Sequence, residues 1–299
     1  MTTMKFMKWM AAGLALGLAV MTTGCEDAPP NDYVQQYVVR GYLIVNEPIR
    51  GIQLTRSLPV TDTFKIERSV VDDADVRLLV DGRTLQLQYR PVQGGAGEYY
   101  LPDTTELVKP ASRYTLEITT KDGVNLSAQT LTPKPFAWVR PPINKVIIPK
   151  KGDPAYLKPP DSLNLIWTDE AGVPEYLISV RALDTLNYGR YLEPATSELN
   201  RRVDSEIDEF DLPRYNETTR WGFLASVQTP IVWAAFKWYG RQEVMVYAAD
   251  RNMINWFKMT QWAGNPQYDP LLGNVKGGVG VFGSAAVIRA DHFLLKNEQ

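Results

Sequence analysis

Cysteine and histidine are almost absent from this sequence, which has one of each among 299 residues, Cys25 and His292. One cysteine excludes a disulfide within the chain, and one histidine excludes a zinc site built from several histidines. Serine hydrolases need a histidine base and a nucleophile on a Gly-x-Ser-x-Gly turn, and that motif is missing. We therefore predict no catalytic residue, no metal and no cofactor. We expect His292 to lie on the surface or on an edge strand.

The sequence also has no large excess of either charge and no long hydrophobic run. The 32 basic and 34 acidic residues leave a formal net charge of −2, without the basic surface that nucleic acid requires. The apolar run at residues 9–21 is shorter than the roughly 20 residues that a transmembrane helix needs. Hydrophobic residues nevertheless make up 44% of the chain, which is enough to build sizeable cores.

The N-terminus has the pattern of a secretion signal. Lys5 and Lys8 precede the apolar run, and Thr-Thr-Gly-Cys follows at 22–25. A small residue before a cysteine resembles the bacterial lipobox, which implies cleavage after Gly24 and a lipid on Cys25. Thr22 stands where the lipobox usually has leucine, so ordinary cleavage that leaves a free thiol is the alternative.

Residues 25–36 are predicted to form a tether behind the signal peptide of residues 1–24. Glu26 and Asp27 follow Cys25 directly, and acidic residues there resemble the surface-export signals of some Gram-negative lipoproteins. A short solvated tether without such a signal is an equal alternative. We expect a protein anchored to the outer membrane through Cys25, facing either the periplasm or the cell surface.

Residues 37–133 are predicted to form an immunoglobulin-like β-sandwich. Asp81-Gly82 and Asp122-Gly123 each separate two short runs of alternating apolar residues. An Asp-Gly pair between such runs is typical of a tight β-hairpin. Short strands at this spacing, with turn residues between them, favour a sandwich.

A proline-rich stretch, 134–161, is predicted to link this domain to a second one at 162–299. Prolines at this density exclude a regular helix or a central strand. Trp167 then closes an early strand, and Pro174 leads into another, which resembles a fibronectin type III sandwich. The sequence therefore predicts an all-β chain of two sandwich domains, the second with one helix near the C-terminus.

The second domain is expected to contain a loop insertion at 184–220, strands at 231–238 and 244–249, and a helix over 251–262 that Asp250 would cap. Three glycines within 277–288 match the spacing of a dinucleotide-binding loop. No strand precedes them and no helical pattern follows, so nucleotide binding is disfavoured. A strand that bulges or approaches another backbone closely is the better interpretation.

Two acidic clusters could supply the carboxylate pair of a glycoside hydrolase. One lies at 72–75, and the other includes Asp208, Glu209 and Asp211. We expect both to be solvated loops, and a carbohydrate-active enzyme using these carboxylates stays an alternative function.

Five tryptophans fall between residues 221 and 262. Exposed tryptophan rings can stack on sugars or fill a partner's pocket. Strand alternation would place Trp233 and Trp238 on opposite faces of 231–238, with one of them inward. Core packing is the main expectation for the group, and we predict ligand or partner contact as a possible role for Trp221, Trp256 and Trp262.

Three segments together resemble the domain-of-unknown-function family 4249. They are Val-Arg-Gly-Tyr at 39–42, Asp-Arg-Asn at 250–252 and the glycine-rich block at 274–283. The resemblance implies a lipoprotein of Bacteroidota-type bacteria, an outer-membrane address, frequent association with TonB-dependent transporters and no known catalytic residue. We therefore expect a non-enzymatic, lipid-anchored protein that binds a partner or ligand. A structural or adhesive surface component is a further alternative.

Overall fold

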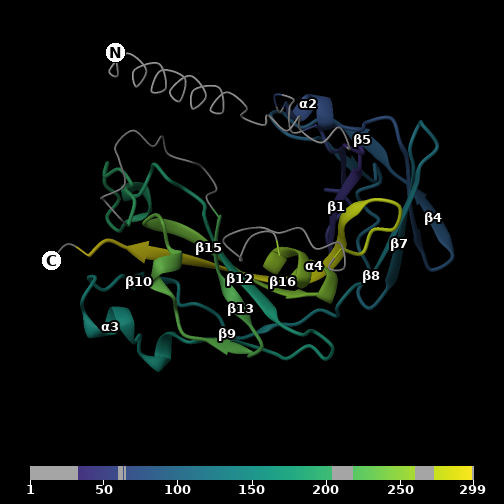
Figure 1. Cartoon of the computed structure of the whole chain (residues 1–299). Helices are drawn as coiled ribbons and strands as arrows, with labels where there is room; N and C mark the ends of the chain where they lie inside the picture. Colours follow the sequence, from purple (N-terminus) through teal and green to yellow (C-terminus); the bar gives the residue numbers. More distant parts are fainter. Residues whose placement is uncertain (1–32, 60–62, 64, 204–217, 260–272, 298–299) are drawn as a thin grey trace, which may run out of the picture. The chain divides into compact units, whose positions relative to one another are not determined.

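The computed structural model describes residues 33–59, 63, 65–203, 218–259 and 273–297 (Figure 1). Cys25, Trp262 and the acidic cluster at 206–211 lie outside the described residues. The chain divides into two compact units, Met1–Gln35 and Gln36–Gln299. The second unit is all-β apart from short helices, as the sequence predicts.

The largest sheet joins strands from the two ends of the second unit. Its longest strand is β16 (Val279–Leu295), the yellow arrow of Figure 1, which pairs antiparallel with β15 (Gly240–Ala249). On its other side, β16 pairs in parallel with β1 (Tyr37–Ile44) and, further along, with β10 (Lys145–Ile147). The full order is β13-β12-β15-β16-β1-β2, where β13 is Thr218–Leu224, β12 is Tyr176–Ala182 and β2 is Gln53–Arg56.

Three smaller sheets and three short α-helices complete the described fold. A four-stranded sheet contains β4 (Arg83–Gln86), β3 (Asp75–Val80), β7 (Arg113–Thr119) and β8 (Asn125–Leu131). A three-stranded sheet contains β14 (Gln228–Thr229), β11 (Leu165–Trp167) and β9 (Trp138–Arg140), and β5 (Gln88–Arg90) pairs with β6 (Glu98–Tyr100). The α-helices are α2 (Ile66–Ser69), α3 (Pro154–Leu157) and α4 (Arg251–Phe257).

Both predicted hairpins of the first half are confirmed. β3 and β4 pair across Asp81-Gly82, where both residues have positive φ, 50° and 72°. β7 and β8 pair across the turn that contains Gly123. Strand alternation then turns Tyr114, Leu116 and Ile118 inward, each at most 1% exposed. These side chains pack in a first core that also includes Phe282 of β16.

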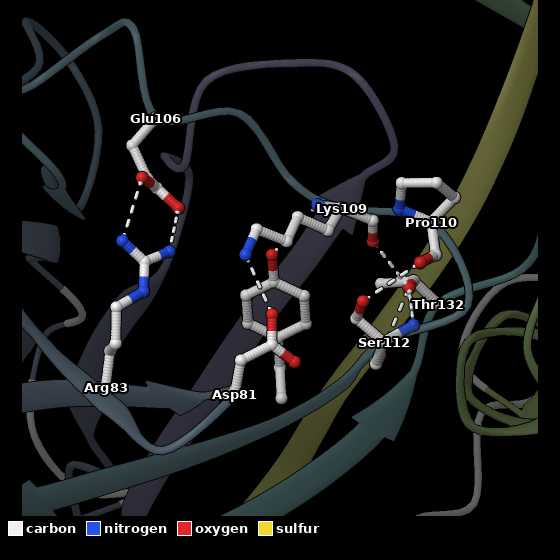
Figure 2. A network of polar contacts seen from close by, with 8 residues as sticks. Asp81, Arg83, Glu106, Lys109, Pro110, Ser112 and Thr132 are labelled. Atoms are coloured by element: carbon white, nitrogen blue, oxygen red, sulfur yellow. Dashed lines mark hydrogen bonds and ion pairs between the residues drawn. The ribbon is translucent and has the colours of Figure 1, made fainter.

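Ion pairs hold the segment before β7 on the β3–β4 hairpin (Figure 2). Arg83 donates two hydrogen bonds to the Glu106 carboxylate, at 2.5 and 3.3 Å, and Lys109 Nζ lies 2.7 Å from Asp81 Oδ2. The Thr132 hydroxyl donates to the Lys109 carbonyl at 2.7 Å. The hydrogen bonds from Arg83 lower the pKa of the Glu106 carboxyl below its ordinary value. These charges are solvated, so the network positions the segment more than it stabilises the fold.

A second core lies on one face of the large sheet. It includes Trp167 of β11 together with Tyr176 and Ile178 of β12, all at most 2% exposed. On the opposite face, Met253 and Phe257 of α4 pack with Leu177, Ala249 and Ala285. The large sheet is therefore covered on both faces, by the three-stranded sheet's side chains and by α4.

The division into two domains, 37–133 and 162–299, stays a prediction, because residues 36–299 form one compact unit and the large sheet joins strands from both. β1 belongs to the predicted first domain and β16 to the second, and residues 38–44 of β1 pair with residues 279–285 of β16. The segment 134–161, expected to be a linker, contributes β9, β10 and α3 to the second half. No proline lies within β9 or β10, which leaves their pairing intact, and Pro154 takes the first position of α3, where its missing N–H costs nothing.

The predicted strand at 231–238 is wrong. Trp233–Ala235 forms a turn of 3₁₀-helix, so side chains there do not alternate between two faces. Trp233 and Trp238 are both buried, at 2% and 5% exposure. The expected cap of the following helix is confirmed, because Asp250 Oδ1 accepts a hydrogen bond from Met253 N at 2.9 Å. α4 as described ends at Phe257.

The glycine-rich end of the chain forms a strand that approaches another backbone closely, as predicted. Gly280 has φ of +118°, and a Cβ built there would lie 1.9 Å from the Val39 carbonyl oxygen. A Cβ at Gly278 would lie 2.7 Å from the Tyr37 carbonyl oxygen. Only glycine therefore allows β16 to run beside β1 at this distance.

Candidate functional site

A cleft of about 460 Å³ opens where the first half of the molecule meets α4. The end of β8 and the start of β7 form one side of it, and the loop 170–173 and residues 249–252 form the other. Figure 1 shows α4 and β8 as neighbouring elements. Cavities of this size, with a few convergent polar groups, are typical of small-molecule sites.

The carboxylate of Asp250 ties three elements together beside this cleft. Its Oδ2 accepts hydrogen bonds from the Thr130 hydroxyl at 2.6 Å and from Asn252 Nδ2 at 3.0 Å. The Thr130 hydroxyl also lies 2.7 Å from Ser284 Oγ. Together with the cap bond to Met253, these contacts join β8, β16 and α4. Burial raises the pKa of the Asp250 carboxyl, although the hydrogen bonds oppose this.

Two asparagines hold the same pair of backbone carbonyls. Asn274 Nδ2 donates to Gln129 O at 2.9 Å and to Phe282 O at 2.8 Å, and its Oδ1 accepts from Phe282 N. Asn252 Nδ2 also donates to Gln129 O, at 3.1 Å. The segments 250–252 and 274–283, both singled out in the sequence, therefore meet here. Sequence reasoning missed Thr130, because nothing local marks a threonine of β8 as a partner of Asp250.

The cleft has more basic than acidic side chains on its walls. Arg113, Lys134 and Arg251 line it, and all three are exposed. Their side chains make no ion pair with any of the described residues. Glu170 is the one carboxylate besides Asp250, and its Oε1 accepts a hydrogen bond from Lys134 N at 3.2 Å. Sequence reasoning could not find this set, because its members are far apart in the chain.

Neither described tryptophan of the predicted contact set lines the cleft. Trp221 is half-buried at the edge of the second core, where its Nε1 donates to Thr229 Oγ1 at 3.2 Å. Its ring centroid lies 6.3 Å from that of Phe236. Trp256 is half-buried on α4. Contact of Trp221, Trp256 or Trp262 with a ligand or partner stays a prediction.

The acidic cluster at 72–75 is solvated, as expected. Asp72, Asp73 and Asp75 are exposed, and Asp73 lies 3.5 Å from Lys121 Nζ. No group of three or more histidine, cysteine or acidic residues in the described part of the chain is placed to hold a metal ion. Among those same residues, no helix is long and apolar enough to cross a membrane.

His292 is buried, so the expectation of a surface or edge position is wrong. It is 2% exposed on β16, its Nδ1 lies 2.6 Å from the Ile143 carbonyl oxygen, and its ring centroid lies 5.4 Å from that of Phe236. Burial lowers the pKa of His292, and the hydrogen bond to Ile143 opposes this in part. The histidine is therefore a neutral packing residue.

Replacing His292 with phenylalanine is expected to make the fold less sensitive to mild acid. Because the folded-state pKa is lowered, the unfolded chain takes up the proton first as the pH falls below about 6.5. The wild type then loses up to about 1.4 kcal/mol of stability per pH unit until the folded-state pKa is reached. Phenylalanine keeps a ring beside Phe236 and removes the proton site.

Urea unfolding at pH 7.5 and 5.5 measures this difference. The free energy of unfolding should fall more in the wild type than in His292→Phe over that interval. Equal falls in the two proteins would contradict the assignment, because His292 is the chain's one histidine.

Comparison with known proteins identifies a family and distant structural likenesses. The family model of the domain of unknown function DUF4249 matches residues 26–290. No curated protein matches the chain. A solved structure of Sidekick-1 immunoglobulin domains 1–5 is similar at 10% identity and a TM-score of 0.18, over 88% of this chain and 39% of that one. The chain thus spans well under half of that structure, and so low a TM-score carries no argument about function.

Proposed function

We propose that this chain, which belongs to the family of the domain of unknown function DUF4249, is a lipid-anchored protein of a bacterial outer membrane. In this proposal it binds a ligand or partner and catalyses no reaction. The observation that carries the proposal is the sequence at 22–25, a small residue and a cysteine directly after a short apolar run. The family match begins at the next residue, 26, which is consistent with a mature chain that starts at Cys25.

Binding is favoured over catalysis because two titratable side chains, one beside the cleft and one elsewhere on β16, are engaged within the fold. Asp250 accepts three hydrogen bonds from within the protein, and His292 is packed against Phe236. Both are therefore occupied in holding the fold. The cleft beside Asp250, in contrast, presents exposed polar groups that can contact a ligand. A TonB-dependent transporter is the partner that we propose, on the family resemblance.

Replacing Cys25 with serine is expected to remove the protein from the membrane. Each buried methylene of an acyl chain contributes about 0.8 kcal/mol, and anchoring needs more than one chain, all of which depend on the thioether. After growth with a radiolabelled fatty acid, the wild type should carry label and sediment with outer membranes. Cys25→Ser should carry none and appear in the soluble fraction.

A matched control is the double variant Glu26→Gln, Asp27→Asn. It should keep the label and stay in the membrane fraction. Protease added to whole cells then compares its exposure at the cell surface with that of the wild type. Unlabelled wild-type protein would contradict the anchor and favour ordinary cleavage. Detergent co-purification under native conditions tests the partner, and a chain recovered without any transporter would contradict that part of the proposal.

A further inference from the structure

The basic side chains that line the cleft beside Asp250 outnumber the carboxylates there. Arg113 begins β7, Lys134 follows β8, and Arg251 begins α4, so three separate elements each place a cation on one cavity. None of the three forms an ion pair with a described residue. Elsewhere in the described structure, exposed basic residues such as Arg83 and Arg289 do lie against carboxylates.

The two carboxylates at the cleft are already engaged by the protein. Asp250 accepts hydrogen bonds from Thr130, Asn252 and the backbone N–H of Met253. Glu170 Oε1 accepts from the backbone N–H of Lys134. With two carboxylates against three guanidinium and ammonium groups, the walls of the cleft carry an excess of positive charge, which attracts anions. Its partly apolar walls, which include Leu131 and Val173, lower the local dielectric and strengthen that attraction.

We propose that this cleft binds a small soluble molecule with at least two negative charges, held by Arg113, Lys134 and Arg251. The volume of about 460 Å³ lies within the range of small-molecule pockets, roughly 300–1,000 Å³. Guanidinium groups bind carboxylates and phosphates through paired N–H donors, and the lysine adds a point charge. The inference rests on the proposed function only in that the site binds its ligand and does not transform it.

Isothermal titration of the full chain in detergent, at low ionic strength, tests the site with three probes. Citrate represents a polycarboxylate, inorganic pyrophosphate a phosphate compound, and glucose an uncharged molecule of similar size. We expect at least one of the two anions to bind, glucose not to bind, and added sodium chloride to weaken the binding. Whichever anion binds more tightly identifies the chemical class of the natural ligand.

Variants then locate the binding. The triple variant Arg113→Gln, Lys134→Gln, Arg251→Gln should raise the dissociation constant at least tenfold, and Arg113→Gln alone should raise it severalfold. Lys158→Gln removes an exposed cation outside the cleft and should leave it unchanged. If the triple variant misfolds, Arg113→Gln alone still tests whether the anion binds in this cleft.

Failure of both anions to bind the wild type, equal binding of glucose, or equal weakening by Lys158→Gln would overturn the inference. None of these results bears on the lipid anchor, which Cys25→Ser tests separately.

Discussion

Replacing Gly280 with alanine is expected to destabilise the protein by about 4 kcal/mol or more, among the largest effects of a single substitution. The new Cβ would lie 1.9 Å from the Val39 carbonyl oxygen, so β1 and β16 would have to separate by more than an ångström. The φ of +118° also suits only glycine and would add strain. Separation would break parallel hydrogen bonds along β1 and open the first core, to which both Val39 and Phe282 belong.

Thermal unfolding followed by circular dichroism measures this loss. A change of this size corresponds to a fall in Tm of about 10 °C or more for a chain of this length. Gly222→Ala is the matched control, because Gly222 lies in β13 of the same sheet, has no positive φ, and a Cβ there meets nothing within 4 Å. It should be neutral or slightly stabilising. Similar losses in both variants would show that the close approach of β1 and β16 is not the cause.

Replacing Asp250 with alanine is expected to destabilise the protein by about 1–3 kcal/mol. The helix cap is lost, which costs about 1 kcal/mol and more where the donor left without an acceptor, here Met253 N, is buried. The other two donors keep an acceptor, because Asn252 Nδ2 still donates to the Gln129 carbonyl and the Thr130 hydroxyl can turn to Ser284. Chemical denaturation gives the free energy of unfolding directly. Asp291→Ala, an exposed aspartate of β16, is the control and should change it little.

The stabilising effect of Asp250 is expected to grow as the solution becomes acidic. Because its folded-state pKa is raised, the folded chain binds a proton at a pH where the unfolded chain has not yet done so. Protonation of this group therefore favours the fold, and the gap between wild type and Asp250→Ala should widen as the pH falls towards the ordinary aspartate pKa of about 4. A gap that narrows would contradict the raised pKa. Asp250→Asn, which cannot titrate, serves as the reference.

Features that depend on neighbouring residues could be predicted from the sequence. The turns at Asp81-Gly82 and Asp122-Gly123 need only the local tolerance of positive φ, and the cap at Asp250 needs only the three residues after it. The prediction of a strand in the apolar run 231–238 was wrong for the same reason. It satisfied a local strand pattern, while the packing of Trp233 in the second core imposed a 3₁₀ turn.

Features that join distant residues could not be predicted. Val39 and Gly280 are paired in register although most of the chain separates them, and no periodicity reports such a partner. The burial of His292 depends on Ile143 and Phe236, which come from other segments. The cleft could not be predicted either, because Arg113, Lys134 and Arg251 come from distant segments that meet only in the folded chain.

The pairing of β1 with β16 also sets the order in which the chain can fold during synthesis. Residues 37–44 are made well before residues 279–295, which form the strand that pairs with them. Until then, one edge of β1 and one edge of β15 lack their hydrogen-bonding partner, and Phe282 is missing from the first core. Long-range pairing of this kind slows folding. This topology therefore favours completion of the fold only after residues 279–295 have been made.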